Sequence, residues 1–169
     1  LLCFISAGPR RLRADVTPVP LTSSQVGQDP YKFNGVILAD DSFLGRQGSG
    51  SVVRHANLVL SCAHVVYDQK NLLDPWLEDV RWFWKYHASA TPSWAKGKVL
   101  RGYARLSSYQ FAAGAYGSDS RGAFESDVIA HYAYESLAGG EFGGWLTNGL
   151  AALLARGDKM ISGYPTGLY

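Results

Sequence analysis

Residues 48–68 read GSGSVVRHANLVLSCAHVVYD, and the rest of the chain is organised around them. Two β-rich runs, 51–54 and 58–61, flank a polar break, which predicts a hairpin. The hairpin leads into a turn that carries His64, followed by two valines. A histidine between a packed strand and an apolar pair is fixed by backbone on both sides while its ring can still face a cleft. Because imidazole titrates near neutrality, this position suits a general base.

Three parts of this stretch occur in one order. Gly-Ser-Gly at 48–50 precedes the hairpin, and the hairpin ends on Ala-His-Val-Val at 63–66. This order resembles the trypsin-like (chymotrypsin-fold) serine peptidases, in their bacterial branch. The cysteine that often follows the histidine in animal enzymes is absent, and Cys62 lies two residues before His64, so that disulfide is not implied. The resemblance implies that His64 is catalytic; on the residues alone, a core histidine satisfied by a backbone carbonyl is the alternative.

The composition indicates one folded domain. The chain has 169 residues, of which 47% are hydrophobic and 18% charged, enough to bury a single core. Its 19 glycines and 13% aromatic residues favour short strands and tight turns, so we expect an all-β fold. A formal charge of +2 is too small to indicate nucleic acid or an anionic membrane as partner. No apolar stretch approaches the roughly 18 residues of a membrane span.

The N-terminal 30 residues differ from the remainder. The chain opens with LLCFISAG, which resembles the end of a signal-peptide apolar region with small residues at the cleavage zone; a buried strand is the alternative. Residues 9–30 combine arginines with proline, serine and glycine, a composition typical of a leader or linker. We therefore expect residues 1–30 to be a signal-peptide remnant and leader, residues 31–169 to be the folded domain, and the protein to be secreted or periplasmic. The two cysteines, Cys3 and Cys62, do not support a disulfide framework.

Several runs after residue 31 predict individual elements. We expect strands at 33–38, 79–86, 99–106 and 128–132, loops at 88–97 and 107–122, a helix at 146–156 and a strand at 159–165. The run 79–86 alternates apolar with mostly polar residues, which predicts a strand with one aromatic face. Aromatic residues from Trp76 to Trp94 could bind a sugar, yet such stripes in β proteins are more often core. His131 alternates with apolar neighbours and is interpreted as structural.

A second stretch carries an acidic residue into a β-branched run, Asp-Val-Ile-Ala at 127–130. It resembles the Asp-Ile-Ala segment of the same family, with one residue more before alanine, and this implies that Asp127 is the carboxylate of a Ser-His-Asp triad. Asp79, Asp119 and Glu125 are possible substitutes. A turn or strand cap is the structural alternative for Asp127.

The family resemblance implies an antiparallel β-barrel, the first of two, with the second barrel beyond residue 169. It implies peptide-bond hydrolysis through an acyl-enzyme, acting on a polypeptide substrate without metal or cofactor. The nucleophile should lie in a Gly-Asn/Asp-Ser-Gly context, which no residue after Asp127 offers; Ser136 and Ser162 lack the preceding glycine. We therefore expect an incomplete serine endopeptidase, inactive alone.

Two other classes of function stay open. A non-catalytic binding or structural domain would use the Trp76 to Trp94 region and predicts His64 and Asp127 far apart. A metal hydrolase would need ligand spacing that the four histidines do not show. The sequence predicts neither a particular substrate specificity nor an oligomeric state.

Overall fold

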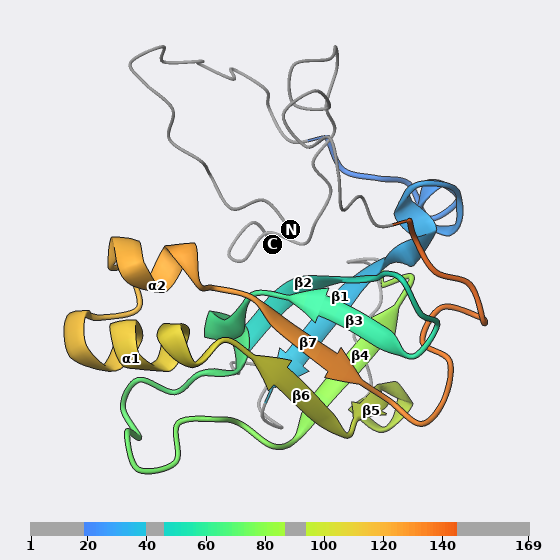
Figure 1. The fold of residues 1–169 in the computed structure, drawn as a ribbon. Coiled ribbons are helices and arrows are strands. Elements are labelled where there is room, and N and C mark those ends of the chain that lie inside the picture. The colour runs from blue at the N-terminus through green and yellow to red at the C-terminus, as the bar shows by residue number, and fades with distance from the viewer. Residues whose placement is uncertain (1–18, 40–45, 87–93, 145–169) are drawn as a thin grey trace, which may run out of the picture.

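The computed structural model describes residues 19–39, 46–86 and 94–144, and these form a seven-stranded, fully antiparallel sheet curled into a nearly closed barrel (Figure 1). The expected all-β fold is thereby confirmed. The strands are β1 (Asn34–Ala39), β2 (Arg46–Val52), β3 (Leu58–Ser61), β4 (Val80–Trp84), β5 (Lys98–Leu100), β6 (Gly102–Arg105) and β7 (Ile129–Tyr132).

Strand order around the barrel is β5-β4-β1-β2-β3-β7-β6. The predicted hairpin is β2 with β3, paired from Gly50 opposite Ser61 to Val52 opposite Val59. On its other edge β3 pairs with β7, which starts two residues after Asp127. Both β3 and β7 are internal strands, as the sequence predicted, and their pairing joins the two stretches singled out above.

The run predicted as one strand at 99–106 is two strands. Lys98–Leu100 pairs with β4, whereas Gly102–Arg105 pairs with β7, and Arg101 lies between them. Because β5 and β6 are the two ends of the strand order, this single residue carries the chain from one edge of the sheet to the other. A sharp bend in a strand is a common way to close a barrel.

The barrel core is built around Trp82, which is fully buried. Its ring lies over two glycines of neighbouring strands: a Cβ on Gly35 would come within 2.6 Å of the ring and one on Gly50 within 3.0 Å. Its indole Nε1 donates to the carbonyl of Leu137 at 3.0 Å. The buried side chains around it include Ile37, Val52, Val59, Val66, Ile129 and Leu137. The aromatic face predicted for 79–86 is therefore core at its centre, and glycine is needed where the indole approaches the backbone.

The predicted small-residue loop at 107–122 is wrong. It contains helix α1 (Ser107–Tyr116) and the start of helix α2 (Arg121–Glu125), which lie together at one end of the barrel (Figure 1). In α1 the buried residues Tyr109, Ala112 and Ala113 follow the i, i+3, i+4 spacing of a helix with one packed face. The helical stretch predicted at 146–156 and the strand at 159–165 lie outside the described residues.

Short 3-10 turns occupy Gln25–Gly27, Tyr31–Phe33, Ala63–Val66 and Trp94–Lys96. Of the predicted leader, residues 1–18 lie outside the described residues. Its described part, 19–30, contains no strand, but Val26 is buried, so this part is not wholly unpacked.

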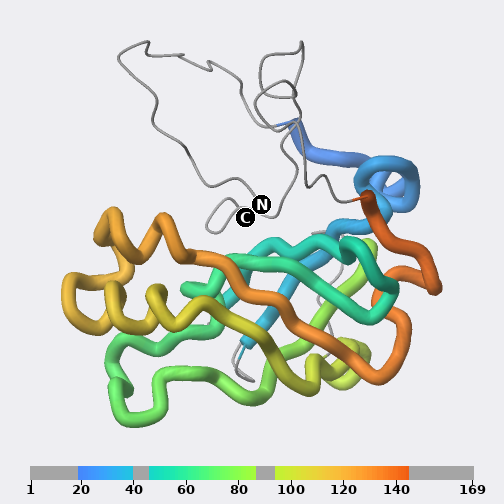
Figure 2. The backbone as a smooth tube through the Cα atoms, viewed as in Figure 1, coloured from blue at the N-terminus to red at the C-terminus, as the bar shows by residue number. Residues whose placement is uncertain are grey.

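After β7 the chain runs back past the hairpin turn (Figure 2), where the amide of Leu137 donates to the carbonyl of Ala56 at 2.8 Å. Within the described ranges, every helix is too short or too polar to cross a membrane.

Candidate active site

His64 lies in the 3-10 turn that follows β3. The residues on either side of it in this turn, Ala63, Val65 and Val66, are all buried, so the turn is anchored in the core while the His64 ring points outward. Gly48 of β2 lies directly beneath Val65: a Cβ at position 48 would come within 2.3 Å of a Val65 methyl group. The glycine of the Gly-Ser-Gly motif therefore makes room for the turn that positions the histidine.

Asp127 is positioned by helix α2. Ser120 caps this helix by accepting the amide of Ala123 at 3.3 Å, and the helix ends at Glu125. The amide of Val128 then donates to the carbonyl of Ser126 at 2.8 Å, which turns the chain into β7. Of the two residues between Asp127 and Ala130, Val128 lies in this turn and Ile129 begins β7. Pairing of β7 with β3 places the end of the turn beside the exit of β3, where His64 follows.

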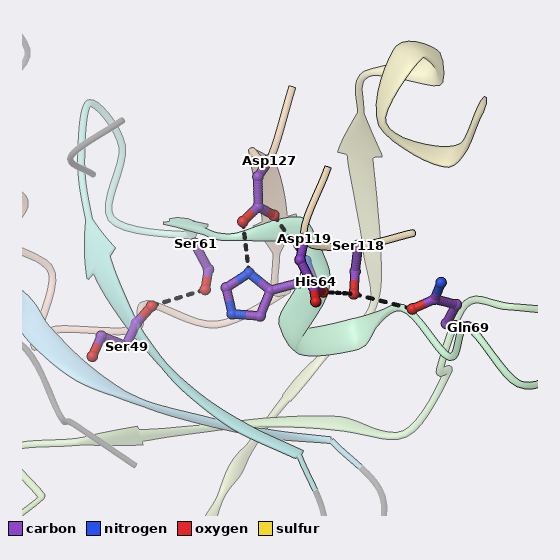
Figure 3. Close-up of polar contacts among 7 residues, drawn as sticks. All are labelled: Ser49, Ser61, His64, Gln69, Ser118, Asp119 and Asp127. Atoms are coloured by element: carbon purple, nitrogen blue, oxygen red, sulfur yellow. Dashed lines mark hydrogen bonds and ion pairs between the residues drawn. The ribbon is translucent and has the colours of Figure 1, made fainter. Parts of the chain in front are cut away.

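The two side chains meet (Figure 3). Nδ1 of His64 lies 2.6 Å from Oδ2 of Asp127, and the backbone amide of His64 donates to Oδ1 at 2.9 Å. The Asp127 side chain is 8% exposed and that of His64 is 53% exposed. The expected contact is thus present, with a buried carboxylate and an accessible imidazole.

The electrostatics favour a charged imidazole. The hydrogen bond that His64 makes to Asp127 and the negative charge of Asp127 raise the pKa of His64 above its usual value, against the opposing effects of burial and of the Arg46 charge. Arg46 is itself paired with Asp68 at 2.7 Å. An imidazole whose protonated form is stabilised in this way can accept a proton at Nε2 and hold it.

The alternative acids do not take this position. Asp79 accepts from Arg81 at 3.1 Å, Glu125 accepts from Arg121 at 2.8 Å, and Asp119 accepts from the Ser118 hydroxyl at 2.9 Å. All three are exposed. Asp127 is the acid against His64, as the sequence resemblance implied.

A cavity of about 380 Å³ opens beside the His64 ring. It is bordered by the segment after His64, by the loop between the two helices and by α2. Its walls carry cationic, anionic and aromatic groups, and the residues lining it are Arg46, His64, Tyr67, Gln69, Lys70, Ser118, Asp119 and Phe124.

Ser61, Ser118 and Ser136 make hydrogen bonds to groups other than the His64 ring. Ser61 donates to the carbonyl of Ser49 at 2.8 Å, and Ser118 shares the cavity but donates to Gln69 at 3.0 Å and to Asp119 (Figure 3). The carbonyl of Ser136 accepts from Lys98. Ser162 lies outside the described residues. The described site therefore brings together a half-exposed imidazole and a buried carboxylate.

Sequence reasoning missed one member of this cluster. The Sγ of Cys62, a ring nitrogen of His64 and a carboxylate oxygen of Asp127 all lie within 4.8 Å of one another. The signal was present, because a cysteine two residues before the histidine lies at the same strand exit.

His131, interpreted as structural, is indeed buried on β7 at 1% exposure, and burial lowers its pKa to about 4.

Comparison of the chain with models of protein families and with curated proteins found no match.

The aromatic region considered for a binding domain is mostly packed. Trp76 and Trp82 are buried, and Trp76 contacts Tyr67 at a centroid distance of 5.0 Å and the Arg105 guanidinium at 4.4 Å. Residues 87–93 of this region lie outside the described residues.

Proposed function

We propose that this chain is the base-bearing part of a serine endopeptidase, with His64 as general base and Asp127 as the carboxylate that orients it. The single observation that carries the proposal is the contact of 2.6 Å between Nδ1 and Oδ2, made by a buried carboxylate to a ring that is half exposed. The alternative of a non-catalytic domain expected these two residues far apart.

The chemistry follows from the two ring nitrogens. With its proton on Nδ1 donated to Asp127, the ring presents Nε2 as a free base toward solvent. A serine hydroxyl brought to Nε2 would lose its proton to the imidazole as its oxygen attacks the peptide carbonyl. The imidazolium, stabilised by Asp127, then returns that proton to the leaving amine. Water repeats the sequence to release the acyl group, so no metal or cofactor takes part.

The fixed carboxylate explains why the base is ready before substrate binds. Oδ1 accepts the backbone amide of His64 and Oδ2 accepts the ring, so the same buried group holds the backbone and the side chain. Rotating the ring away would leave a buried carboxylate oxygen without its partner, which costs about 1–3 kcal/mol. A base held in this way loses little freedom in the transition state.

The nucleophile and the oxyanion-binding amides would come from a second barrel encoded after residue 169, as the family resemblance implies. The cavity beside His64 lies where a substrate side chain next to the reacting bond could bind. We also propose export to the periplasm or the exterior, because residues 1–8 resemble the end of a signal-peptide apolar region.

The test uses the reading frame that continues after Tyr169. It should encode a Gly-x-Ser-Gly motif within about one domain length, on the order of 100 residues. The protein expressed from that frame should react covalently with a fluorophosphonate probe at this serine, and His64→Ala should abolish the labelling. A frame that lacks such a serine, or labelling that persists in His64→Ala at the wild-type rate, would show that the proposal is wrong.

A further inference from the structure

The proposed peptidase chemistry has no role for the thiol beside the pair. Cys62 carries a thiol rather than a disulfide, and its Sγ belongs to the group of three ligand atoms within 4.8 Å of one another. Among residues 19–39, 46–86 and 94–144 this is the one group of three metal-ligating side chains. We propose that Cys62, His64 and Asp127 form a binding site for Zn²⁺ or a similar borderline-soft divalent cation.

The distances suit such an ion after a small movement of the ring. Zn²⁺ binds thiolate at about 2.3 Å and nitrogen or oxygen at about 2.0–2.2 Å, so tetrahedral ligand atoms lie roughly 3.3–3.8 Å apart. The Nδ1 to Oδ2 separation of 2.6 Å must open by about 1 Å, and the longest separation must close by a similar amount. The His64 side chain is 53% exposed and can make this movement, whereas Asp127 is held.

The charges balance when the site fills. A thiolate and a carboxylate each carry one negative charge, and together they neutralise the divalent ion. The thiol proton passes to solvent, and the proton on Nδ1 moves to the other ring nitrogen, Nε2, leaving a neutral imidazole. The neighbouring cation, Arg46, is compensated by Asp68 at 2.7 Å, which limits its repulsion of the metal. The buried carboxylate thus exchanges a hydrogen bond for a metal bond.

The ligand types select the ion. A sulfur, a nitrogen and an oxygen donor match Zn²⁺, Co²⁺ or Cd²⁺, while Mg²⁺ and Ca²⁺ prefer sites made wholly of oxygen. Three protein ligands leave a fourth position, open to solvent on the exposed side of His64. The binding proposal rests on the cluster alone. Its consequence, reversible inhibition by a metal that displaces the Nδ1 to Asp127 hydrogen bond, rests on the proposed function.

The test measures binding on the 169-residue chain without any activity assay. Metal-free protein is titrated anaerobically with Co²⁺, and a thiolate-to-cobalt charge-transfer absorption should appear and saturate at one equivalent. Cys62→Ser should abolish this absorption, and His64→Ala or Asp127→Asn should weaken binding at least about tenfold. The matched controls Cys3→Ser and His55→Ala, changed at residues outside the cluster, should bind as wild type, and Mg²⁺ should not compete.

A second measurement needs no variant. Zn²⁺ at one equivalent should slow the alkylation of Cys62 by iodoacetamide, located by mass spectrometry, at least about tenfold and leave the rate at Cys3 unchanged. The proposal is overturned if folded wild-type chain gives no charge-transfer absorption and no protection. It is equally overturned if the absorption survives Cys62→Ser and disappears in Cys3→Ser. Either failure leaves the peptidase proposal standing. Conversely, if the fluorophosphonate probe does not label the wild-type protein, the peptidase proposal fails and the metal-binding proposal stands.

Discussion

One carboxylate holds both the backbone and the ring of His64: Oδ1 of Asp127 accepts the His64 amide at 2.9 Å and Oδ2 contacts Nδ1 at 2.6 Å. The two residues are 63 positions apart in sequence, and the pairing of β3 with β7 brings them together. Because the carboxylate is buried and the ring is not, the charge is fixed while the base stays accessible.

Asp127→Asn should lower the pKa of His64. In metal-free wild-type chain that pKa lies above 6.5, because the Asp127 hydrogen bond and charge favour the protonated ring. Asparagine keeps the shape and removes the charge, so the fold should persist and the pKa should fall. NMR titration of the His64 ring protons measures both values. Asp119→Asn, at an exposed acid lining the same cavity, is the control and should leave the pKa nearly unchanged. An unshifted pKa in Asp127→Asn would contradict the assignment.

The same shift fixes the direction of a stability effect. A histidine whose folded pKa is raised stabilises the folded state below its unfolded pKa of 6.5, and this contribution is lost as pH rises through the folded pKa. The difference in unfolding free energy between wild type and Asp127→Asn should therefore be larger on the acid side of that window. Urea unfolding at a series of pH values between about 5.5 and 8.5, a range that brackets the ordinary histidine pKa, measures this difference.

Gly48→Ala should destabilise the barrel and disturb His64. The new methyl group would meet a methyl of buried Val65 at 2.3 Å, so the turn that carries the histidine must shift. Overpacking of this kind costs about 1–3 kcal/mol. Gly144→Ala is the matched control, because a Cβ there meets nothing within 4 Å. Urea midpoints measure the stability, and the NMR shift of the His64 ring reports the turn. Equal midpoints for the two variants would argue against close packing of Gly48 on Val65.

His131 should weaken the fold at acid pH. Burial lowers its pKa to about 4, and its Nε2 has no hydrogen-bond partner among the described residues. The unfolded chain binds a proton below about 6.5 and the folded chain only below about 4, so stability should fall by roughly 3 kcal/mol as pH drops between them. His131→Leu should remove this part of the pH dependence. Retention of the full slope in that variant would show that other groups cause it.

Much of this architecture could be predicted because its signals are local. The hairpin at 51–61 and the strand at 79–86 are indicated by strand-forming residues and by alternation with a period of two residues. The Ala-His and Asp-Val-Ile-Ala stretches each lie at a strand end. Helix α1 was missed because its buried face consists of Tyr109 and two alanines, and small residues read as a loop. The break at Arg101 was missed because two partners, β4 and β7, decide it, and no local pattern reports a partner. Cys62 was missed as a neighbour of Asp127 for the same reason.

The purified 169-residue chain should not hydrolyse peptide or ester substrates above background. It presents the proposed base and its carboxylate, and the hydroxyls of Ser61 and Ser118 are hydrogen-bonded to other groups. A fluorogenic assay at neutral pH measures this, with His64→Ala as the background. Hydrolysis that Ser136→Ala or Ser162→Ala abolishes would place the nucleophile within these residues and contradict the two-barrel proposal.

The most direct test of the central claim is the peptidase kcat/KM of the longer protein that we propose, compared between wild type and Asp127→Asn. If Asp127 holds the His64 tautomer, the variant should keep its fold by circular dichroism and lose kcat/KM by about 10⁴-fold, since the amide cannot favour the proton on Nδ1. Asp79→Asn should stay within about threefold of wild type, because Asp79 is an exposed acid paired with Arg81 and does not line the cavity beside His64. Peptidase activity in Asp127→Asn within tenfold of wild type, or no activity in the wild type itself, would contradict the account.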